Sequence, residues 1–220
     1  MTKLKLGAGG TYLPDFVNID ISEKAEISLD LSKDPLPFET STVDLVFSYH
    51  TIEHVPNYLF VLSEIYRVLK PGGIFLLGVP YISLTKYNLV NPYHLHHFNE
   101  YSFDFFDPEK LKGSAVEENR IRFKKSFHRF HYIGIFNLLP YPINRWCRDH
   151  LFNVVRKIDF GLYAVKDGNS TPMVTSKKEF IKLFDQTYNA RIPYNKEKLT
   201  NDDSAIKAFL KKIKRWWTGN

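Results

Sequence analysis

The first half of the chain alternates short apolar runs with polar turns. Apolar, β-favouring runs lie at residues 3–6, 16–19, 26–31, 43–49 and 73–80. The runs at 43–49 and 73–80 are apolar almost throughout, as strands buried on both faces should be. We therefore predict that these runs form strands of one sheet.

A helix is predicted between the last two of these strands. Pro56 suits the first turn of a helix, and the Pro71-Gly72-Gly73 run is expected to end the helix and turn the chain. Apolar residues recur between them at helical spacing: Leu59, Leu62, Ile65, Tyr66 and Leu69. Strands that alternate with helical stretches predict an α/β fold with a doubly wound, mostly parallel sheet.

The second half of the chain has a different pattern. Residues 121–130 and 160–165 are predicted strands, and an apolar, proline-broken insertion at 133–158 lies between them. Residues 167–204 are polar and are expected to be loosely ordered, with one helical stretch near 177–185. We therefore predict a main domain at 1–166 that carries this insertion, a polar extension at 167–204, and a separate C-terminal helix at 205–220.

Composition favours one globular domain with appendages. The 220 residues are 44% hydrophobic and 15% aromatic, which is too apolar for a disordered chain. A single cysteine, Cys147, excludes a disulfide framework and suits a reducing compartment. The sequence shows neither a signal peptide nor an apolar run of the ~20 residues that span a bilayer. We therefore expect a cytoplasmic protein.

The positive charge of the chain is concentrated at its end. The formal net charge is +6, and Lys207, Lys211, Lys212, Lys214 and Arg215 supply +5 of it, which leaves about +1 for the rest. A nearly neutral body argues against a nucleic-acid partner. Residues 205–220 also carry an apolar stripe opposite the cations, so this helix either contacts a membrane surface peripherally or docks on its own domain.

The predicted strands end in residues that suit a nucleotide site. Gly7 to Gly10 follow the first strand, Asp20 and Asp30 close the next two, and Ser48-Tyr49-His50 ends the fourth. Ligands of open parallel sheets bind beyond the carboxyl ends of the strands. Asp20, however, follows Gly9 by eleven positions, whereas the acid of a dinucleotide fingerprint lies about 20 residues past its glycines.

The order of these motifs resembles that of class I S-adenosylmethionine-dependent methyltransferases. The likeness is greatest to small members with LxLGxG, VNxD, EH and RVLKPGG motifs. The corresponding residues here are Leu4 to Gly9, Val17 to Asp20, Glu53-His54 and Arg67 to Gly73. The resemblance covers about the first 100 residues. Members with the VNxD pattern have a shortened first crossover, which accounts for the eleven-residue spacing, and the family fold implies an antiparallel last strand.

The resemblance implies S-adenosylmethionine as co-substrate and a set of residues that bind it. Glycine-turn residues would contact the methionine moiety, Asp20 with Ile21 beside it would meet the ribose, Asp30 and Leu31 the adenine, and the fourth strand end the sulfonium. The implied set is Gly7, Ala8, Gly9, Asp20, Ile21, Asp30, Leu31, Ser48, Tyr49 and His50. Two positions depart from the family pattern, because Lys5 replaces an acid or Asn and Thr11 replaces the third glycine.

Methyl transfer to a hydroxyl requires a general base, for which histidine is the usual choice. The run NPYHLHHFNE follows the fifth predicted strand, so we predict His94 or His97 as the base, with His54 and then His50 next. Alternatively, these histidines only form hydrogen bonds to neighbouring backbone. The spacing of His94, His96 and His97 does not match known structural metal sites, so no metal is predicted.

The function expected from the sequence is methyl transfer to a hydroxyl of a sugar-containing or other small-molecule acceptor, which a lipid could carry. Such acceptors belong to glycan or natural-product biosynthesis. The alternatives are N- or C-methylation of a small metabolite, and a regulatory protein that binds the donor without turnover. The insertion at 133–158 is expected to cap the acceptor site or to rest on a membrane; a homo-oligomer contact or extra core is the other interpretation.

Overall fold

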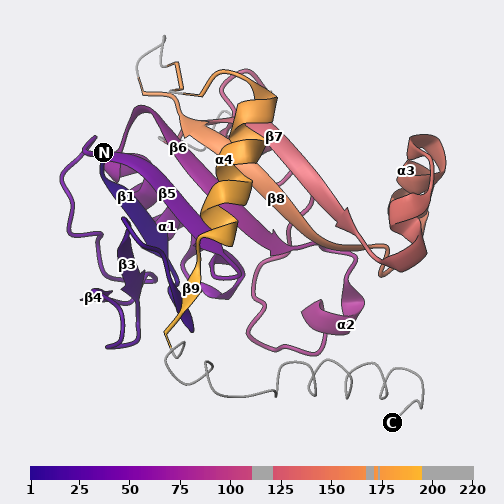
Figure 1. Ribbon diagram of the computed structural model, residues 1–220, viewed down its shortest axis with the longest axis horizontal. Helices are drawn as coiled ribbons and strands as arrows, with labels where there is room; N and C mark the ends of the chain where they lie inside the picture. The colour runs from indigo at the N-terminus through magenta and orange to yellow at the C-terminus, as the bar shows by residue number, and fades with distance from the viewer. Residues whose placement is uncertain (111–120, 167–170, 173, 195–220) are drawn as a thin grey trace, which may run out of the picture.

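The main sheet is mostly parallel, with one antiparallel strand inside it (Figure 1). The computed structural model describes residues 1–110, 121–166, 171–172 and 174–194. In these residues the sheet has seven strands in the order β4-β3-β1-β5-β6-β8-β7. Their bounds are β1 (Lys3–Leu6), β3 (Val17–Asp20), β4 (Ile27–Ser28), β5 (Val43–Tyr49), β6 (Leu69–Pro80), β7 (Phe123–Tyr132) and β8 (Val155–Ala164). Only β8 runs antiparallel to its neighbours β6 and β7. The predicted fold class and the antiparallel last strand are therefore confirmed.

The first crossover is short, as the motif spacing indicates. Residues 7–16 connect β1 to β3 with the two-residue strand β2 (Thr11–Tyr12) and no helix. Leu6 pairs with Ile19 in parallel register, so the glycine turn and Asp20 emerge at the same edge of the sheet. This confirms the shortened crossover and places two of the predicted donor-binding segments together.

Helix α1 (Tyr58–Val68) covers one face of the sheet. Its apolar side packs Val61, Leu62 and Ile65 into the larger of the two core clusters. Asn57 caps the helix by accepting a hydrogen bond from the Phe60 amide at 3.3 Å. Pro56 therefore precedes the cap, so the predicted position of Pro56 in the first turn is wrong.

The chain passes from α1 into β6 without a separate turn, so the predicted role of Pro71-Gly72-Gly73 is wrong in detail. Val43 pairs with Leu69 and Leu45 pairs with Ile74, which leaves residues 70–73 as a bulge within β6. Gly72 supports the bulge with a φ of 72°. The helix has already ended at Val68.

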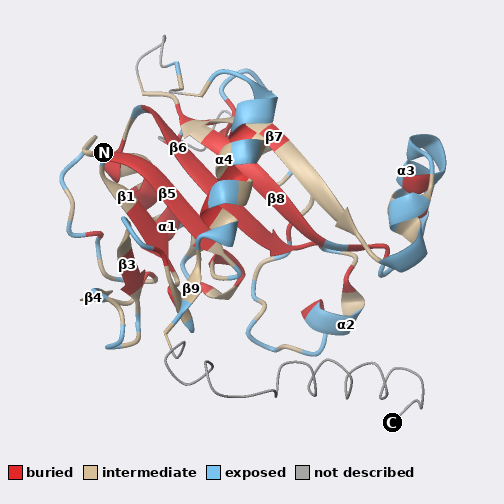
Figure 2. Ribbon diagram, viewed as in Figure 1, coloured by how far each residue is buried: buried red, intermediate tan, exposed pale blue. Residues whose placement is uncertain are grey.

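Helix α4 (Lys177–Asn189) covers the opposite face (Figure 1). Ser176 and Glu179 form a capping box at its start. Phe180 and Phe184 are buried against Leu45, Phe47, Ile74, Leu76 and Phe127 of the sheet. The helical stretch predicted near 177–185 is therefore present and runs four residues further, and its packing makes it an integral layer of the fold, which we did not predict. Figure 2 shows the buried residues concentrated along the strands that α1 and α4 cover.

The insertion between β7 and β8 leaves the sheet as a protruding arm. It contains η3 (Gly134–Leu138) and α3 (Tyr141–His150), and β8 begins at Val155, earlier than predicted. Helix α3 stands apart from the sheet (Figure 1), and most of it is exposed (Figure 2). The Arg148 guanidinium ties it to the body, 4.3 Å from the centroid of the Phe130 ring and 3.4 Å from the Glu100 carboxylate.

The remaining short elements lie near the carboxyl edge of the sheet or join its parts. They are η1 (Ile52–His54), α2 (Thr85–Asn88), η2 (Asp104–Phe106) and β9 (Ile192–Pro193), which pairs with β2. Among the described residues, no helix combines the length and apolar character needed to cross a bilayer. The predicted helix at 205–220 lies outside the described residues.

Candidate active site

Two cavities open at the carboxyl edge of the parallel strands. The first has a volume of about 420 Å³ and contains most of the residues predicted to bind the donor. Its lining residues are Gly7, Gly9, Asp20, Ile21, Leu29, Asp30, Leu31, Ser32, His50, Thr51, His54, Val55 and Pro56. Three predicted contacts do not line it: Ala8 is buried behind the turn, Ser48 is buried within β5, and Tyr49 lines a neighbouring cavity instead. We call this space the donor cavity.

The glycine turn has a shape that only glycine allows at Gly7. Its φ is 69°, and a Cβ built there would lie 1.9 Å from Thr51 Oγ1. Gly9 also has a positive φ, 55°, but a Cβ there would meet no atom within 4 Å. The turn is held to β3 by hydrogen bonds from the Gly7 and Ala8 amides to the Ile19 carbonyl, at 2.9 and 3.1 Å. Backbone can therefore approach a ligand closely here.

The two departures from the family pattern contact each other. The buried Lys5 ammonium donates hydrogen bonds to the Ala8 carbonyl at 3.2 Å and to Thr11 Oγ1 at 2.6 Å. It also donates to the Thr11 carbonyl. Burial, together with the charge of Arg191, lowers the pKa of Lys5 to about 8. Lys5 thus stabilises the glycine turn from the side away from the donor cavity.

The two predicted carboxylates are oriented by local hydrogen bonds. Asp20 accepts from the Gly9 amide at 2.8 Å and from the Ser22 amide at 2.9 Å. Asp30 accepts from the Ser32 amide at 2.9 Å and from its hydroxyl at 2.7 Å. These bonds from Ser32, aided by the charge of Lys33, lower the pKa of Asp30. Asp30 is therefore anionic at neutral pH, and both carboxylates face the donor cavity with fixed geometry.

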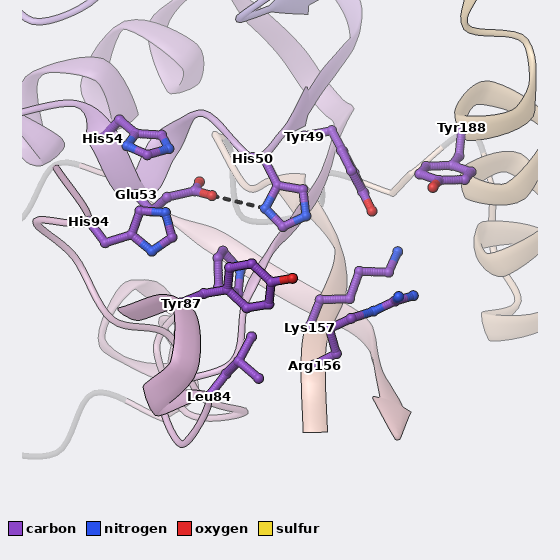
Figure 3. A pocket seen from close by; sticks show the side chains of 11 residues that line it. Tyr49, His50, Glu53, His54, Leu84, Tyr87, His94, Arg156, Lys157 and Tyr188 are labelled. Carbon is purple, nitrogen blue, oxygen red and sulfur yellow. Dashed lines mark hydrogen bonds and ion pairs between the residues drawn. The ribbon is translucent and has the colours of Figure 1, made fainter. Parts of the chain in front are cut away.

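The second cavity, of about 460 Å³, adjoins the first, and His50 and His54 line both. Figure 3 shows its side chains, which come from the end of β5, η1, the segment after β6, the start of β8 and the end of α4. They are Tyr49, His50, Glu53, His54, Pro80, Leu84, Tyr87, His94, Arg156, Lys157 and Tyr188. We call this space the acceptor cavity. His50 is held in the left-handed region with a φ of 52°, a conformation that concentrates at functional sites.

Of the four histidines predicted as candidate bases, His50, His54 and His94 line the acceptor cavity. The His54 and His94 rings pack edge to face, with centroids 4.7 Å apart. His97 is exposed and lines neither cavity. The prediction thus named two histidines that lie together, His54 and His94, but His97 lies outside the cavity, because its irregular segment turns that side chain to solvent.

The tautomer of His94 follows from its neighbour Asn88. The Asn88 amide nitrogen donates to the carbonyls of Tyr81 and Ile82, at 2.8 and 3.1 Å, so its Oδ1 faces His94 Nδ1 at 3.2 Å. His94 Nδ1 must therefore carry a proton, which leaves Nε2 unprotonated in the neutral ring. Burial and the neighbouring His54 lower the pKa of His94, which favours the neutral ring.

A buried ionic network forms another wall of the acceptor cavity. Asp159 is fully buried and accepts from Arg129 at 2.8 Å, from His131 at 2.5 Å and from Lys157 at 3.2 Å. Burial opposes its ionisation, but the His131 hydrogen bond and the Lys157 charge outweigh that effect, so the pKa of Asp159 is lowered. The network holds the Lys157 ammonium 4.8 Å from the ring centroids of both Tyr49 and Tyr188.

Sequence reasoning missed the residues that distant segments bring to the site. Arg156 and Lys157 lie at the start of β8, because its antiparallel direction brings its first residues to the carboxyl edge. Tyr188 comes from α4, and Thr51 lies next to the predicted His50. The antiparallel last strand was predicted, so the position of Arg156 and Lys157 could have been inferred from it.

Comparisons with known proteins point to one fold and one domain type. A family model for a methyltransferase domain matches residues 11–77. A sterol 4-C-methyltransferase of Caenorhabditis elegans is 38% identical over 86 residues, which cover 37% of this chain and 25% of that protein. A sterol 24-C-methyltransferase of Pneumocystis carinii is 39% identical over 59 residues, covering 27% of this chain and 15% of that protein. The matched part thus spans at most about a quarter of either relative.

A solved structure extends the likeness of fold beyond these sequence matches. A methyltransferase from Archaeoglobus fulgidus, described as dependent on S-adenosylmethionine, aligns with 74% of this chain and 85% of its own, with a TM-score of 0.50 and 14% identity. At that identity the alignment shows a shared fold. It includes more of the chain than the segment that the family model matches.

Proposed function

We propose that this chain is a class I S-adenosylmethionine-dependent methyltransferase and that it transfers a methyl group from S-adenosylmethionine to a small-molecule acceptor. The observation that carries the proposal is the junction of the two cavities at His50 and His54. A donor bound along the glycine turn would direct its sulfonium toward this junction. Methyl transfer is an in-line displacement, and alignment of two bound reactants supplies much of its acceleration.

The donor would lie along the strand ends in the order that the motifs follow. The Gly7 and Gly9 turn would hold the methionine moiety, and the Asp20 carboxylate would accept from the ribose hydroxyls. Asp30 and Leu31 would contact the adenine at the far end of the donor cavity. These groups line one cavity and are fixed by their own hydrogen bonds, so little reorganisation would be needed on binding.

The acceptor would present a hydroxyl to the junction and a polar body to the cavity wall. His94 exposes a neutral imidazole nitrogen to the acceptor cavity and can take the hydroxyl proton, with His54 beside it. Arg156, Lys157 and Tyr188 offer donors and aromatic surface suited to sugars and acidic groups. We therefore retain a sugar-containing acceptor, which a lipid could carry, as the preferred class.

C-methylation of an apolar lipid is the second candidate. The named relatives act on sterols, and the acceptor cavity also has apolar lining from Pro80, Leu84 and Tyr87. Such a reaction would need no hydroxyl in the acceptor. If the protein converted hydroxyl-bearing glycolipids into O-methyl products, with no new carbon–carbon bond, this candidate would be contradicted.

Calorimetric titration of S-adenosylhomocysteine into the protein tests the donor site. We expect micromolar binding that Asp20→Ala weakens at least tenfold, because the ribose hydroxyls of the ligand would lose the carboxylate that accepts their hydrogen bonds. Glu23→Ala is the matched control, since Glu23 is an exposed acid three residues away that does not line the donor cavity. Absence of binding to the unmodified protein would refute the proposed function.

A further inference from the structure

Three side chains at the junction of the cavities have the composition of a metal-binding site. We infer that Glu53, His54 and His94 bind a divalent transition-metal cation. Each offers one nitrogen or carboxylate oxygen, and these three atoms lie within 4.8 Å of one another. Two imidazoles and one carboxylate form the protein ligand set of many catalytic zinc sites, which leave a fourth position open. Figure 3 shows the three side chains grouped at one end of the acceptor cavity.

Both histidines are oriented as metal ligands are. His54 Nδ1 lies 2.9 Å from the Tyr93 carbonyl oxygen, and His94 Nδ1 lies 3.2 Å from Asn88 Oδ1. Each contact engages one ring nitrogen with a protein oxygen and leaves Nε2 free. A metal-ligating histidine almost always has its second nitrogen hydrogen-bonded in this way, which fixes both the tautomer and the ring orientation.

The third ligand is a buried carboxylate with one oxygen unused. The Glu53 side chain is 1% exposed, and its Oε1 accepts from His50 Nδ1 at 3.0 Å. Its Oε2 is buried and has no hydrogen-bond partner among the described residues. Burying a carboxylate oxygen without a partner is unfavourable. A cation beside it would compensate that cost.

The backbone holds the two ligand-bearing segments together. The amides of Leu95 and His96 donate to the Glu53 carbonyl at 2.9 and 3.2 Å, which pins the segment that carries His94 onto η1. The site therefore does not depend on the His94, His96 and His97 spacing that argued against a metal in the sequence. Its ligands come from two segments about 40 residues apart, so no local motif would reveal it.

The ligand set selects the ion. Tetrahedral ligand atoms at 2.0–2.2 Å from one ion lie about 3.4 Å from one another. Side-chain rotations that move the ligand atoms by about 1 Å would therefore bring them to coordination distance. Two imidazoles favour Zn²⁺, Fe²⁺ or Ni²⁺ over Mg²⁺, which prefers oxygen ligands and water. Zn²⁺ is therefore the appropriate probe, and Mg²⁺ should not bind here.

The position of the site gives the cation a role, and this role rests on the proposed function. The bound cation would use its open coordination position to bind the oxygen of the acceptor hydroxyl, and this would lower the pKa of that hydroxyl. His94 would then act as a ligand, and the hydroxyl proton would pass to solvent water and not to an imidazole base. The acceptor would have to carry an oxygen ligand, which favours a hydroxyl over an apolar carbon.

Zinc titration of the full chain after treatment with a chelator tests the inference. We expect one Zn²⁺ per chain with a Kd in the micromolar range or below, and no binding of Mg²⁺. His54→Gln and His94→Gln should each weaken Zn²⁺ binding at least 30-fold, as should Glu53→Gln. His97→Gln is the matched control, because His97 is an exposed histidine of the same segment that lines neither cavity. Visible absorption of the Co²⁺-loaded protein should report nitrogen and oxygen ligands.

Two results would overturn the inference: no saturable Zn²⁺ binding, or equal affinity in the protein and both histidine variants. The partly exposed histidines decide the outcome, because Glu53→Gln could unfold the chain. Circular dichroism and S-adenosylhomocysteine titration of the same samples verify folding. Donor binding without Zn²⁺ binding would reject the cation and leave the proposed function intact. Zn²⁺ binding without donor binding would support the cation site and reject the proposed function.

Discussion

At the scale of single residues, Lys5 and Thr11 show how two unusual side chains can support one turn. The Lys5 ammonium reaches three oxygens of the segment 8–11, and Thr11 supplies two of them. A third glycine at position 11 would offer the carbonyl but no hydroxyl. The glycine turn is therefore stabilised by a buried cation, at the electrostatic cost that its lowered pKa reveals.

That cost predicts how stability depends on pH. The pKa of Lys5 is about 8 in the folded chain against 10.5 ordinarily. Between these values the unfolded chain binds a proton that the folded chain has released, so the free energy of unfolding should rise with pH. From about pH 7 to about pH 10 the contribution of Lys5 should be about 2 kcal/mol.

Urea denaturation at both pH values, compared with Lys5→Met, measures this contribution. Met cannot titrate, so the variant should lack the rise that Lys5 adds to the unfolding free energy. Because other groups titrate equally in both proteins, only the difference between the two curves is diagnostic. If the unfolding free energies of the two proteins changed with pH in parallel, the pKa of Lys5 would not be lowered in the folded chain.

The two glycines of the turn should respond differently to alanine. Gly7→Ala combines the positive φ with a Cβ that overlaps Thr51, so it should destabilise the fold by about 3 kcal/mol or more. Gly9→Ala meets no atom and should cost only the backbone term of about 1 kcal/mol. Chemical denaturation of both variants measures the difference. Equal losses would mean that Thr51 moves aside.

Local motifs explain why much of the donor cavity could be predicted, whereas of the acceptor cavity only the histidines and Tyr49 could be. Gly7, Asp20 and Asp30 each lie at the end of a short strand, and strand order fixes their proximity. Arg156 and Tyr188 reach the acceptor cavity only through the direction of β8 and the docking of α4. His97 shows a further limit, because the direction of a side chain in an irregular segment depends on contacts that the sequence does not state.

At the scale of elements, the docking of α4 on the sheet is the main feature that we did not predict, although its helical stretch was. Phe180, Phe184 and Tyr188 recur at every fourth position, so the sequence contained the signal of an amphipathic helix. The residues on either side of this helix are polar, so the sequence did not indicate that the helix packs on the sheet. The first crossover has no helix, and Leu13 from that crossover joins Phe180 and Phe184 in the same cluster. Helix α4 thus covers sheet residues that the short crossover leaves open.

This packing predicts that α4 contributes to global stability. Phe184→Ala should lower the free energy of unfolding by about 3–4 kcal/mol, because it removes a fully buried ring from the core. Lys182→Ala is the control, since Lys182 is exposed on the same helix and should change stability by less than about 0.5 kcal/mol. Thermal and urea unfolding measure both. A Phe184→Ala protein as stable as the control would mean that α4 is dispensable.

At the scale of the whole molecule, two segments that meet near the acceptor site carry many exposed apolar side chains. Segment 82–95 and the arm at 133–153 meet there, joined by a 3.1 Å hydrogen bond from Thr85 Oγ1 to Asn153 Oδ1. We call their exposed apolar residues the apolar rim: Ile82, Tyr87, Leu89, Val90, Tyr93, Leu95, Ile135, Leu138, Tyr141, Ile143, Trp146, Leu151 and Phe152. Leu138 is 82% exposed and Leu89 is 78% exposed, which is unfavourable in water.

We expect the apolar rim to contact lipid, in keeping with the prediction that the arm rests on a membrane. The exposed Lys86 adds positive charge beside the rim, so anionic vesicles should bind better than neutral ones. In flotation with phosphatidylglycerol vesicles, Leu138→Ser combined with Phe152→Ser should reduce the bound fraction several-fold. Leu59→Ser is the control, because Leu59 is 58% exposed but lies on α1. Equal flotation of all three proteins would refute the expectation.

The place of α4 in the chain has a consequence for synthesis on the ribosome. Leu45, Phe47, Ile74 and Leu76 emerge long before the helix that covers them, so the nascent chain carries an uncovered apolar sheet face until residue 189 has been translated. Tyr188, which completes the wall of the acceptor cavity, arrives in the same last step. Nascent intermediates should therefore recruit chaperones that bind apolar surface. A chain arrested before α4 would lack both its last protective layer and its finished acceptor cavity.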